Sequence, residues 1–385
     1  MRGSVFKRGR SWTAQVFLGR DAVTGRKRYR QWGGFPTRRA AEQALTRQLE
    51  LLRVGDYADA GTTTLGDFLD RWLESVGTRV RPTTAASYRD MLEGHVVPRI
   101  GNVRLDQLRP MILSSLYTDL LAGGRRSGTG GLSARTVQYI HRIVSNALSD
   151  AVRWNLLAWN PASRVDAPRV EMKEMRTWSA VDVRRFLAGV ADDRLFALWL
   201  LLCTTGMRRG EALGLGWRDI DFAGGNVAAR RQLVEVNYEL RYSEPKTARG
   251  RRSVALDGYA VVALREHRDR QRKERSDLGA LDPAELVFTK LDGTPLQPQN
   301  VSQAFGNIIR RDGLPTIRLH DLRHTAASLM LAAGVHPKIV SERLGHAGIQ
   351  ITLDRYSHVT AGLQAEAANV LARAVFEPRP DGDAP

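Results

Sequence analysis

The stretch from His320 to Tyr356 holds the side chains of this sequence that are best suited to chemistry. His320 and Arg323 are three residues apart, so a helix would place them on one face. An arginine presents a planar, permanently charged fork that fits two phosphate oxygens, and a histidine can move a proton near neutral pH. A tyrosine can act as a covalent nucleophile where nearby groups offset its developing charge. These residue types suit phosphodiester chemistry, although a histidine and an arginine one turn apart are more often part of an ordinary exposed helix face.

An amphipathic helix is expected to carry the His320–Arg323 pair. Leu322, Ala326 and Leu329 continue an apolar stripe on an adjoining face. Gly334 suits the left-handed residue that often ends such a helix. The helix would therefore hold an imidazole and a guanidinium side by side on a rigid element.

Two further stretches add basic residues to this set. The first follows the apolar run Leu195–Cys203 and reads Thr-Gly-Met-Arg-Arg-Gly-Glu over residues 205–211. The second reads Glu-Pro-Lys-Thr over residues 244–247 and precedes Arg-Ser-Val at 252–254. With Leu-Gly-His at 344–346 and Asp-Arg-Tyr at 354–356, residues 175–375 resemble the catalytic domain of the tyrosine recombinases, the phage integrase family. The matching positions are Arg208, Lys246, His320, Arg323, His346 and Tyr356.

The resemblance implies a role for each of these residues. Transfer of a phosphodiester to a tyrosine passes through a pentacoordinate phosphorane, whose extra negative charge needs preorganised donors. Arg208 and Arg323 would supply them, with a hydrogen bond from His346. Tyr356 would attack and leave a 3′-phosphotyrosine, from which a second 5′-hydroxyl can rejoin strands without ATP. The remaining roles fall to three residues: Lys246 as general acid for the leaving 5′-oxygen, His320 to handle the tyrosine proton or brace the phosphate, and Glu211 to orient Arg208.

No metal ion or cofactor is expected. His324 follows His320 at the four-residue spacing of a zinc pair, but no glutamate comes directly after His320 and no third ligand is evident. Cys203 is the single cysteine, so the sequence offers neither an intrachain disulfide nor a cysteine-based zinc site.

The charge of the chain points to a polyanionic partner. It has 385 residues, with 58 lysines and arginines against 41 acidic residues and a formal net charge of +17. Such an excess is typical of nucleic-acid binding. No stretch reaches the roughly 18 apolar residues that would span a bilayer, and no signal peptide is visible. Double-stranded DNA is the expected partner, in the cytoplasm of a bacterial host cell and associated with the nucleoid.

Residues 1–55 are expected to form a small arm-type DNA-binding domain. The pattern predicts strands at residues 4–7, 12–18 and 27–32 and a helix over residues 38–52. Thirteen basic residues against three acidic ones give this segment a net charge of +10. Trp12, Tyr29 and Trp32 are expected to be mostly core. Arg28 and Arg30 are candidates for DNA contact, on a sheet face presented to a groove.

A linker at residues 56–64 is expected to lead into a helical core-binding, SAM-like domain at residues 65–165. Apolar residues recur there at helical spacing, Pro82 and Pro110 each suit a first helical turn, and Ser133 suits an N-cap. Candidate contacts to the DNA backbone are Arg125, Arg126, Arg135, Arg142 and Arg153.

The catalytic domain, residues 175–375, is expected to mix helices with one small antiparallel sheet. Strands are predicted at residues 227–233, 238–242 and 252–255, with Lys246 in the last connection and Arg249 and Arg251 as DNA-backbone contacts. Helices are predicted near residues 180–190, 193–206, 258–276 and 298–311, the first with a capping-box-like start at Ser179 and Asp182. Residues 376–385 are expected to be a disordered tail. The fold class is therefore mainly α with small β-sheets, an α+β arrangement.

The expected function is site-specific DNA recombination that integrates, and also excises, a phage or other mobile element. A homotetramer on attachment-site DNA is expected, with an excisionase and a host DNA-bending protein as partners. The alternatives are a type IB topoisomerase-like enzyme and a catalytically inactive DNA-binding regulator. The basic N-terminal segment and the local sequence around Lys246 and Tyr356 disfavour the topoisomerase-like enzyme. The complete set of six residues disfavours the inactive regulator.

Overall fold

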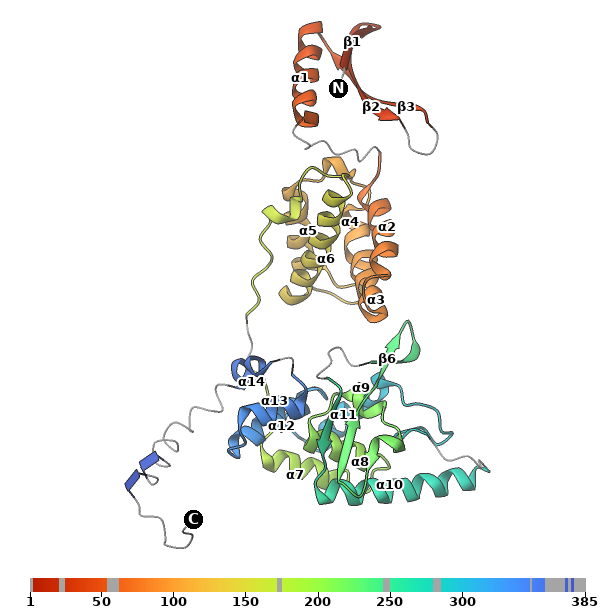
Figure 1. Ribbon diagram of the computed structural model, residues 1–385, viewed down its shortest axis with the longest axis vertical. Coiled ribbons are helices and arrows are strands. Elements are labelled where there is room, and N and C mark those ends of the chain that lie inside the picture. The colour runs from red at the N-terminus through yellow and green to blue at the C-terminus, as the bar shows by residue number, and fades with distance from the viewer. Residues whose placement is uncertain are drawn as a thin grey trace, which may run out of the picture. The chain divides into compact units, whose positions relative to one another are not determined.

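The chain divides into two compact units, Met1–Met172 and Lys173–Pro385 (Figure 1). The computed structural model describes residues 3–20, 25–53, 62–171, 175–244, 250–279, 285–346, 348–356, 371–372 and 375–376. Most of these residues are helical, and the strands form small antiparallel sheets. This confirms the predicted α+β class.

The first unit opens with an antiparallel sheet in the order β1-β2-β3. Its strands are β1 (Gly3–Arg8), β2 (Ser11–Arg20) and β3 (Lys27–Phe35), and the helix α1 (Arg38–Arg53) packs against all three. The three strands and the helix lie where the sequence predicts them. Ala14, Val16 and Ala41 form the buried centre of this segment.

The aromatic residues of this segment are not the core that the sequence predicts. Trp12 and Trp32 are only half-buried, and Tyr29 is 46% exposed. A three-stranded sheet with one helix is too small to enclose an indole ring. Arginines cover the two rings instead, with the guanidinium of Arg38 5.9 Å from the Trp12 ring and that of Arg30 5.8 Å from the Trp32 ring.

The rest of the first unit is helical. Its elements are α2 (Leu65–Gly77), α3 (Pro82–Met91), a π-helical turn (Leu92–Val96), α4 (Val97–Ile100), a 3-10 turn (Leu105–Gln107), α5 (Pro110–Gly123), α6 (Ala134–Arg153) and a 3-10 turn (Pro161–Arg164). The prolines lie in first turns and Ser133 caps α6, as predicted. The core of these helices includes Phe68, Trp72 and Leu148, and all of its buried members lie between Leu65 and Ala162.

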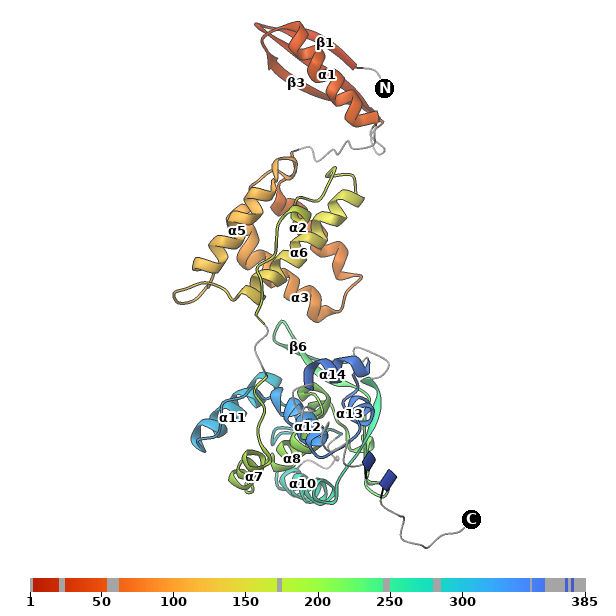
Figure 2. The same ribbon diagram turned by 90° about the vertical axis from the view of Figure 1, so that its left-hand side faces the viewer.

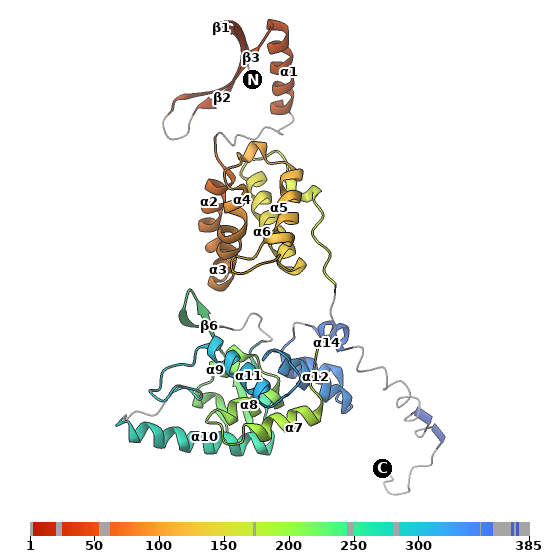
Figure 3. The same ribbon diagram turned by 180° about the vertical axis from the view of Figure 1, so that it is seen from behind.

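The second unit is built around α8 (Phe196–Thr205), which lies among the other helices (Figures 2 and 3) and is buried from Ala197 to Cys203. The helices α7, α9, α10 and α12 pack against it. The helices are α7 (Ala180–Gly189), α8 (Phe196–Thr205), α9 (Arg209–Leu213), α10 (Gly258–Asp277), α11 (Pro298–Arg311), α12 (Asp321–Ala332), α13 (Pro337–Leu344) and α14 (Ile349–Tyr356). The predicted capping box at the start of α7 is present between Ser179 and Asp182.

The strands of the second unit form two sheets, so the prediction of one sheet is wrong. They are β4 (Ile220–Asp221), β5 (Asn226–Ala229), β6 (Gln232–Val236), β7 (Glu239–Ser243) and β8 (Arg252–Ala255). One sheet has the order β4-β5-β8, and β6 and β7 form a separate hairpin (Figure 1).

The predicted strand at residues 227–233 is divided between β5 and β6 at Arg231. The Arg231 side chain donates from Nε to the Gly214 carbonyl at 2.9 Å and from Nη2 to the Glu285 carboxylate at 2.8 Å. These bonds fix the chain where it passes from one sheet to the other. The residue pattern within one strand cannot predict these bonds, because both partners of Arg231 lie elsewhere in the sequence.

The helix α12 is not amphipathic as predicted, because it is buried all round over its first two turns. Every residue from Asp321 to Ser328 is buried. The helices α8 and α13 pack against α12, and the backbone N–H of Trp178 donates to Thr325 Oγ1 at 3.1 Å. Gly334 does have the predicted left-handed conformation, with φ +79°. Arg323 and His324 therefore lie inside the unit rather than on a solvated face.

Candidate active site

The junction between α8 and α9 places Arg208 close to α13. Gly206 ends α8 in the left-handed conformation, with φ +64°. A Cβ atom at this position would lie 2.6 Å from Leu344 Cδ2. Glycine is therefore required both by the backbone angle and by the close approach of α13. Two residues later, Arg208 immediately precedes α9 and is 37% exposed.

Glu211 lies between two arginines. It is 1% exposed and accepts a hydrogen bond from Arg208 Nη1 at 2.6 Å and from the Arg208 backbone N–H at 2.9 Å. Arg252 donates to the same carboxylate from Nη2 at 3.0 Å and from Nη1 at 3.2 Å. The contacts are those expected of a residue that orients Arg208.

The charge of Glu211 depends on these partners. Burial alone would raise the pKa of the carboxyl, but the hydrogen bonds and charge of Arg252 and the charge of Arg208 outweigh it. The pKa of Glu211 is therefore lowered, and the carboxylate is ionised at neutral pH.

Three guanidinium groups meet the last turn of α13. Arg252 Nε donates to the Arg343 carbonyl at 2.6 Å, Arg323 Nη2 donates to the Leu344 carbonyl, and Arg208 Nη2 lies 3.5 Å from the Gly345 carbonyl. The last carbonyls of a helix lack intrahelical partners and carry the negative end of its dipole. The turn therefore attracts these cations and sets their positions. Arg323, 3% exposed, also donates from Nη1 to the Gly206 carbonyl at 2.8 Å.

His346 follows this turn directly. Gly345 adopts the left-handed conformation, with φ +67°, and the backbone N–H of His346 donates to the Ser341 carbonyl at 3.0 Å. His346 Nδ1 lies 2.8 Å from Thr352 Oγ1, and both residues are buried. Thr352 belongs to α14, one turn before Tyr356, so the contact connects His346 to the helix that carries the tyrosine.

His320 stands at the start of α12, three residues before Arg323. It is exposed, and its ring centroid lies 5.4 Å from that of His324. Partial desolvation lowers the pKa of His320, and the charge of Arg323 lowers it further. The imidazole is therefore neutral at pH 7 and can accept a proton. Within the described part of the chain, no group of three histidine, cysteine, aspartate or glutamate side chains could hold a metal ion.

The structure brings Arg208, Arg323 and His346 together at the last turn of α13, and places Glu211 against Arg208; all four are predicted from the sequence. Sequence reasoning missed Arg252 as a member of the cluster. It also missed Thr352, whose only sequence signal is its place one helical turn before Tyr356.

Four of the predicted side chains lie outside the described residues. Lys246 and Arg249 lie outside the described residues, as do the side chains of Arg28 and Tyr356. Tyr356 is the last residue of α14. Arg251 is exposed and forms an ion pair with Glu244.

The predicted DNA-contact arginines of the first unit differ in their surroundings. Arg135 and Arg142 are exposed on α6, the latter with its guanidinium 5.4 Å from the Tyr139 ring. The other four have polar partners: Arg30 with the Asp106 carboxylate, Arg125 with the Gly131 carbonyl, Arg126 with the carbonyl and carboxylate of Asp90, and Arg153 with Asp150.

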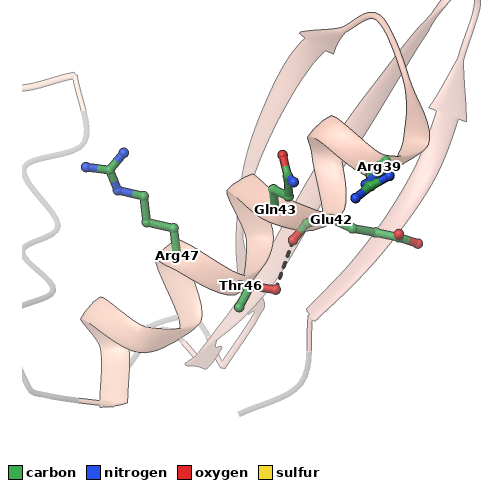
Figure 4. Close-up of a pocket in the computed structure, with 5 residues that line it drawn as sticks. All are labelled: Arg39, Glu42, Gln43, Thr46 and Arg47. Carbon is green, nitrogen blue, oxygen red and sulfur yellow. Dashed lines mark hydrogen bonds between the residues drawn. The ribbon is translucent and has the colours of Figure 1, made fainter.

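An open surface pocket lies on α1 (Figure 4). It is lined by Arg39, Glu42, Gln43, Thr46 and Arg47, and Thr46 Oγ1 donates to the Glu42 carbonyl at 3.0 Å. Its side chains all come from one exposed helix face, which gives it basic character but no grouping suited to catalysis.

In the described residues, no helix has the length and apolar character needed to cross a bilayer.

Comparison with known proteins agrees with this arrangement. Residues 181–362 match the phage integrase family, and residues 64–121 match the N-terminal SAM-like domain of phage integrases. The chain is 31% identical over 382 residues to a "Tyrosine recombinase XerC-like" protein of Caldanaerobacter subterraneus subsp. tengcongensis, covering 92% of this chain and 94% of the relative.

Two solved structures share the fold. One is the Tn1549 transposon integrase in complex with a circular intermediate DNA, with a TM-score of 0.67 and 21% identity over 80% of this chain and 99% of that chain. The other is a lambda integrase tetramer bound to a Holliday junction, with a TM-score of 0.57 and 18% identity over 91% of this chain and 94% of that chain. Together with the family match and the XerC-like relative, they show that this chain belongs to the tyrosine recombinases of the phage integrase family and is a site-specific recombinase.

Proposed function

We propose that this recombinase integrates and excises a phage or other mobile element by cleaving and rejoining attachment-site DNA through a 3′-phosphotyrosine at Tyr356. The observation that carries the proposal is the meeting of Arg208, Arg323 and His346 at one helix end, followed by the helix that ends at Tyr356. These are the cationic donors and the nucleophile that transfer of a phosphodiester to tyrosine needs.

The arginines would stabilise the phosphorane. Arg208 is part-exposed and oriented by Glu211, so its guanidinium can meet the non-bridging phosphate oxygens. Arg323 contributes its charge from the interior, where a low dielectric strengthens it. His346 adds a hydrogen bond to the same oxygens. Because these donors are held in place before DNA binds, little reorganisation is needed during the reaction.

Proton transfer would fall to two residues. The Tyr356 oxygen attacks phosphorus and loses its proton, while the bond from phosphorus to the 5′-oxygen breaks and that oxygen gains a proton. Lys246 is assigned as the general acid for the leaving oxygen. His320, neutral at pH 7, accepts the tyrosine proton or hydrogen-bonds the phosphate. Reversal of these steps with a different 5′-hydroxyl rejoins the strands.

Duplex DNA is the proposed partner of both units. The basic residues of β3, of the helical domain at 65–165 and of the segment around Arg249 and Arg251 would contact its backbone. A homotetramer on DNA is proposed with support from the tetrameric lambda integrase, and an excisionase and a host DNA-bending protein complete the proposed assembly. The site of action would be the cytoplasm of a bacterial host, at the nucleoid.

Cleavage is expected to proceed without a metal ion. Side chains alone would stabilise the phosphorane, so covalent attachment to a nicked attachment-site duplex should be unchanged in excess EDTA. The measurement is the fraction of protein that shifts to the covalent complex on a denaturing gel, with and without EDTA. Loss of the complex in EDTA and its return with magnesium would contradict the proposed chemistry.

The N-terminal segment is expected to bind DNA separately from catalysis. Residues 1–55 have a net charge of +10 but contain none of the six proposed catalytic residues. A protein that begins at Thr62 should still cleave core-site DNA but should lose arm-site affinity and most recombination of full-length attachment sites. Each duplex phosphate contact lowers the logarithm of the binding constant by about 0.9 per logarithm of salt, so residues 1–55 should bind with steep salt dependence.

Gel-shift titrations of each protein at two salt concentrations, together with a recombination assay, test this division. It is wrong if the shortened protein recombines full-length sites as well as the intact chain. It is also wrong if the folded 1–55 fragment shows no DNA affinity at low salt.

A further inference from the structure

Arg252 is an extensively hydrogen-bonded arginine beside the proposed site. It is the first residue of β8, and its side chain is only 7% exposed. Its guanidinium donates to both oxygens of Glu211, to the Arg343 carbonyl at 2.6 Å and to the Gly250 carbonyl at 3.3 Å. One side chain therefore joins β8, α9 and the last turn of α13.

Each of these contacts leads to a residue of the proposed site. Through Glu211, Arg252 reaches Arg208, because the two guanidiniums share one carboxylate. Through the Arg343 carbonyl it holds the turn that ends at Gly345 and positions His346. The Arg252 side chain is buried against these partners, so its influence on the phosphate would pass through them.

We propose that Arg252 is a positioning residue for phosphodiester cleavage, which sets Arg208 through the shared Glu211 carboxylate and sets His346 through the last turn of α13. The inference rests on the proposed function, in which Arg208 and His346 bind the phosphate. It adds to the six predicted residues a seventh that acts without contacting the reacting atoms.

The sharing of Glu211 explains why a second arginine is needed. A carboxylate that is 1% exposed must be compensated by nearby cations, since an unpaired buried charge is strongly destabilising. With Arg252 present, Arg208 supplies only part of this compensation and keeps 37% of its side chain exposed. Without Arg252, Glu211 would draw Arg208 inward as its sole partner and away from the phosphate.

The planar fork of arginine suits this position. It reaches two carboxylate oxygens and a backbone carbonyl at once, which the compact ammonium of a lysine cannot reproduce. Lysine would restore charge to Glu211 but not all of these bonds. Arg252→Lys should therefore recover part of what Arg252→Gln loses.

The experiment compares variants of the full-length protein on a nicked duplex of the mapped attachment site. Arg252→Gln should lower the rate of covalent complex formation at saturating DNA by about 100-fold, the effect of misplacing catalytic groups by about 1 Å. DNA affinity should remain that of the wild type. Arg252→Lys should fall between the two.

Arg194→Gln is the matched control. Arg194 also places its fork on one carboxylate, that of Glu274, and donates to a backbone carbonyl, that of Thr289 at 2.7 Å. It is similarly part of the second unit, but its bonds are to Glu274 of α10 and to Thr289 rather than to Glu211 or α13. Its loss should lower thermal stability as Arg252→Gln does while leaving the cleavage rate unchanged.

A pH profile separates positioning from general destabilisation. With Arg252 removed, the effect of burial on Glu211 is opposed by Arg208 alone, and the pKa of its carboxyl should rise. Cleavage by Arg252→Gln should then show an additional acid limb, beyond the one that His320 gives the wild type. A Glu211→Gln/Arg252→Gln double variant should lack this acid limb, because no carboxyl remains to titrate.

The reference variant Arg208→Gln distinguishes failure of this inference from failure of the proposed function. A wild-type rate for Arg252→Gln beside an inactive Arg208→Gln would overturn this inference alone. Equal losses of cleavage in Arg252→Gln and Arg194→Gln would also overturn it, because the loss would then follow stability. A wild-type rate for Arg208→Gln would overturn the proposed function and this inference with it.

Discussion

Replacing Tyr356 with phenylalanine is expected to abolish the covalent protein–DNA complex while leaving folding and DNA binding unchanged. The substitution removes the phenol oxygen, which is the proposed nucleophile, and keeps the ring. Without that oxygen no phosphotyrosine can form, and the loss should reach the detection limit of the assay. The measurement is the covalent fraction on a denaturing gel after incubation with a nicked attachment-site duplex, alongside a gel-shift titration.

Tyr259→Phe is the matched control for this variant. Tyr259 is 83% exposed at the start of α10, and no role in cleavage is assigned to it. Its phenylalanine variant should form the covalent complex at the wild-type rate. A covalent complex from Tyr356→Phe at any comparable rate would show that another residue is the nucleophile.

Arg208→Gln is expected to lower the cleavage rate by about 10²–10³-fold, the usual effect of removing one preorganised donor to a developing anion. Glutamine keeps hydrogen-bonding capacity but loses the charge and the fork that match phosphate oxygens. Glu211 keeps Arg252 as a partner in this variant, so the buried carboxylate remains compensated and the fold should persist.

The measurement for Arg208→Gln is the single-turnover rate at saturating DNA. A loss confined to the rate would place the missing interaction in the transition state. A loss confined to DNA affinity, with the maximal rate intact, would contradict the role given to Arg208. The Arg194→Gln protein serves again as the control for removal of a part-buried arginine.

Local features of this fold could be predicted because their causes are local. The capping residues Ser133 and Ser179, and the left-handed Gly334, each depend on a few neighbouring positions. Arg208, Arg323 and His346 could be predicted as partners because the short motifs around them, and the order of these motifs, resemble those of the family. The structure adds that all three meet the same turn of α13.

The features that sequence reasoning missed depend on distant contacts. Glu211 and Arg252 are 41 positions apart, and Arg252 and Arg343 are 91 apart, so no local pattern joins them. The burial of α12 likewise depends on packing outside the helix, because α8 and α13 lie against it. The divided sheet follows from the anchoring of Arg231 by Gly214 and Glu285.

Direct identification of the amino acid that carries DNA tests the central claim. The covalent complex formed on a nicked attachment-site duplex would be digested with nuclease and trypsin and analysed by fragmentation mass spectrometry. Tyr356 is the single tyrosine of the tryptic peptide 356–373, which also contains Ser357 and Thr360 as other hydroxyl groups. The proposed mechanism predicts a nucleotide linked through its 3′-phosphate to the Tyr356 oxygen, and a free 5′-hydroxyl on the released strand. A nucleotide on any other residue, or a linkage through a 5′-phosphate, would contradict it.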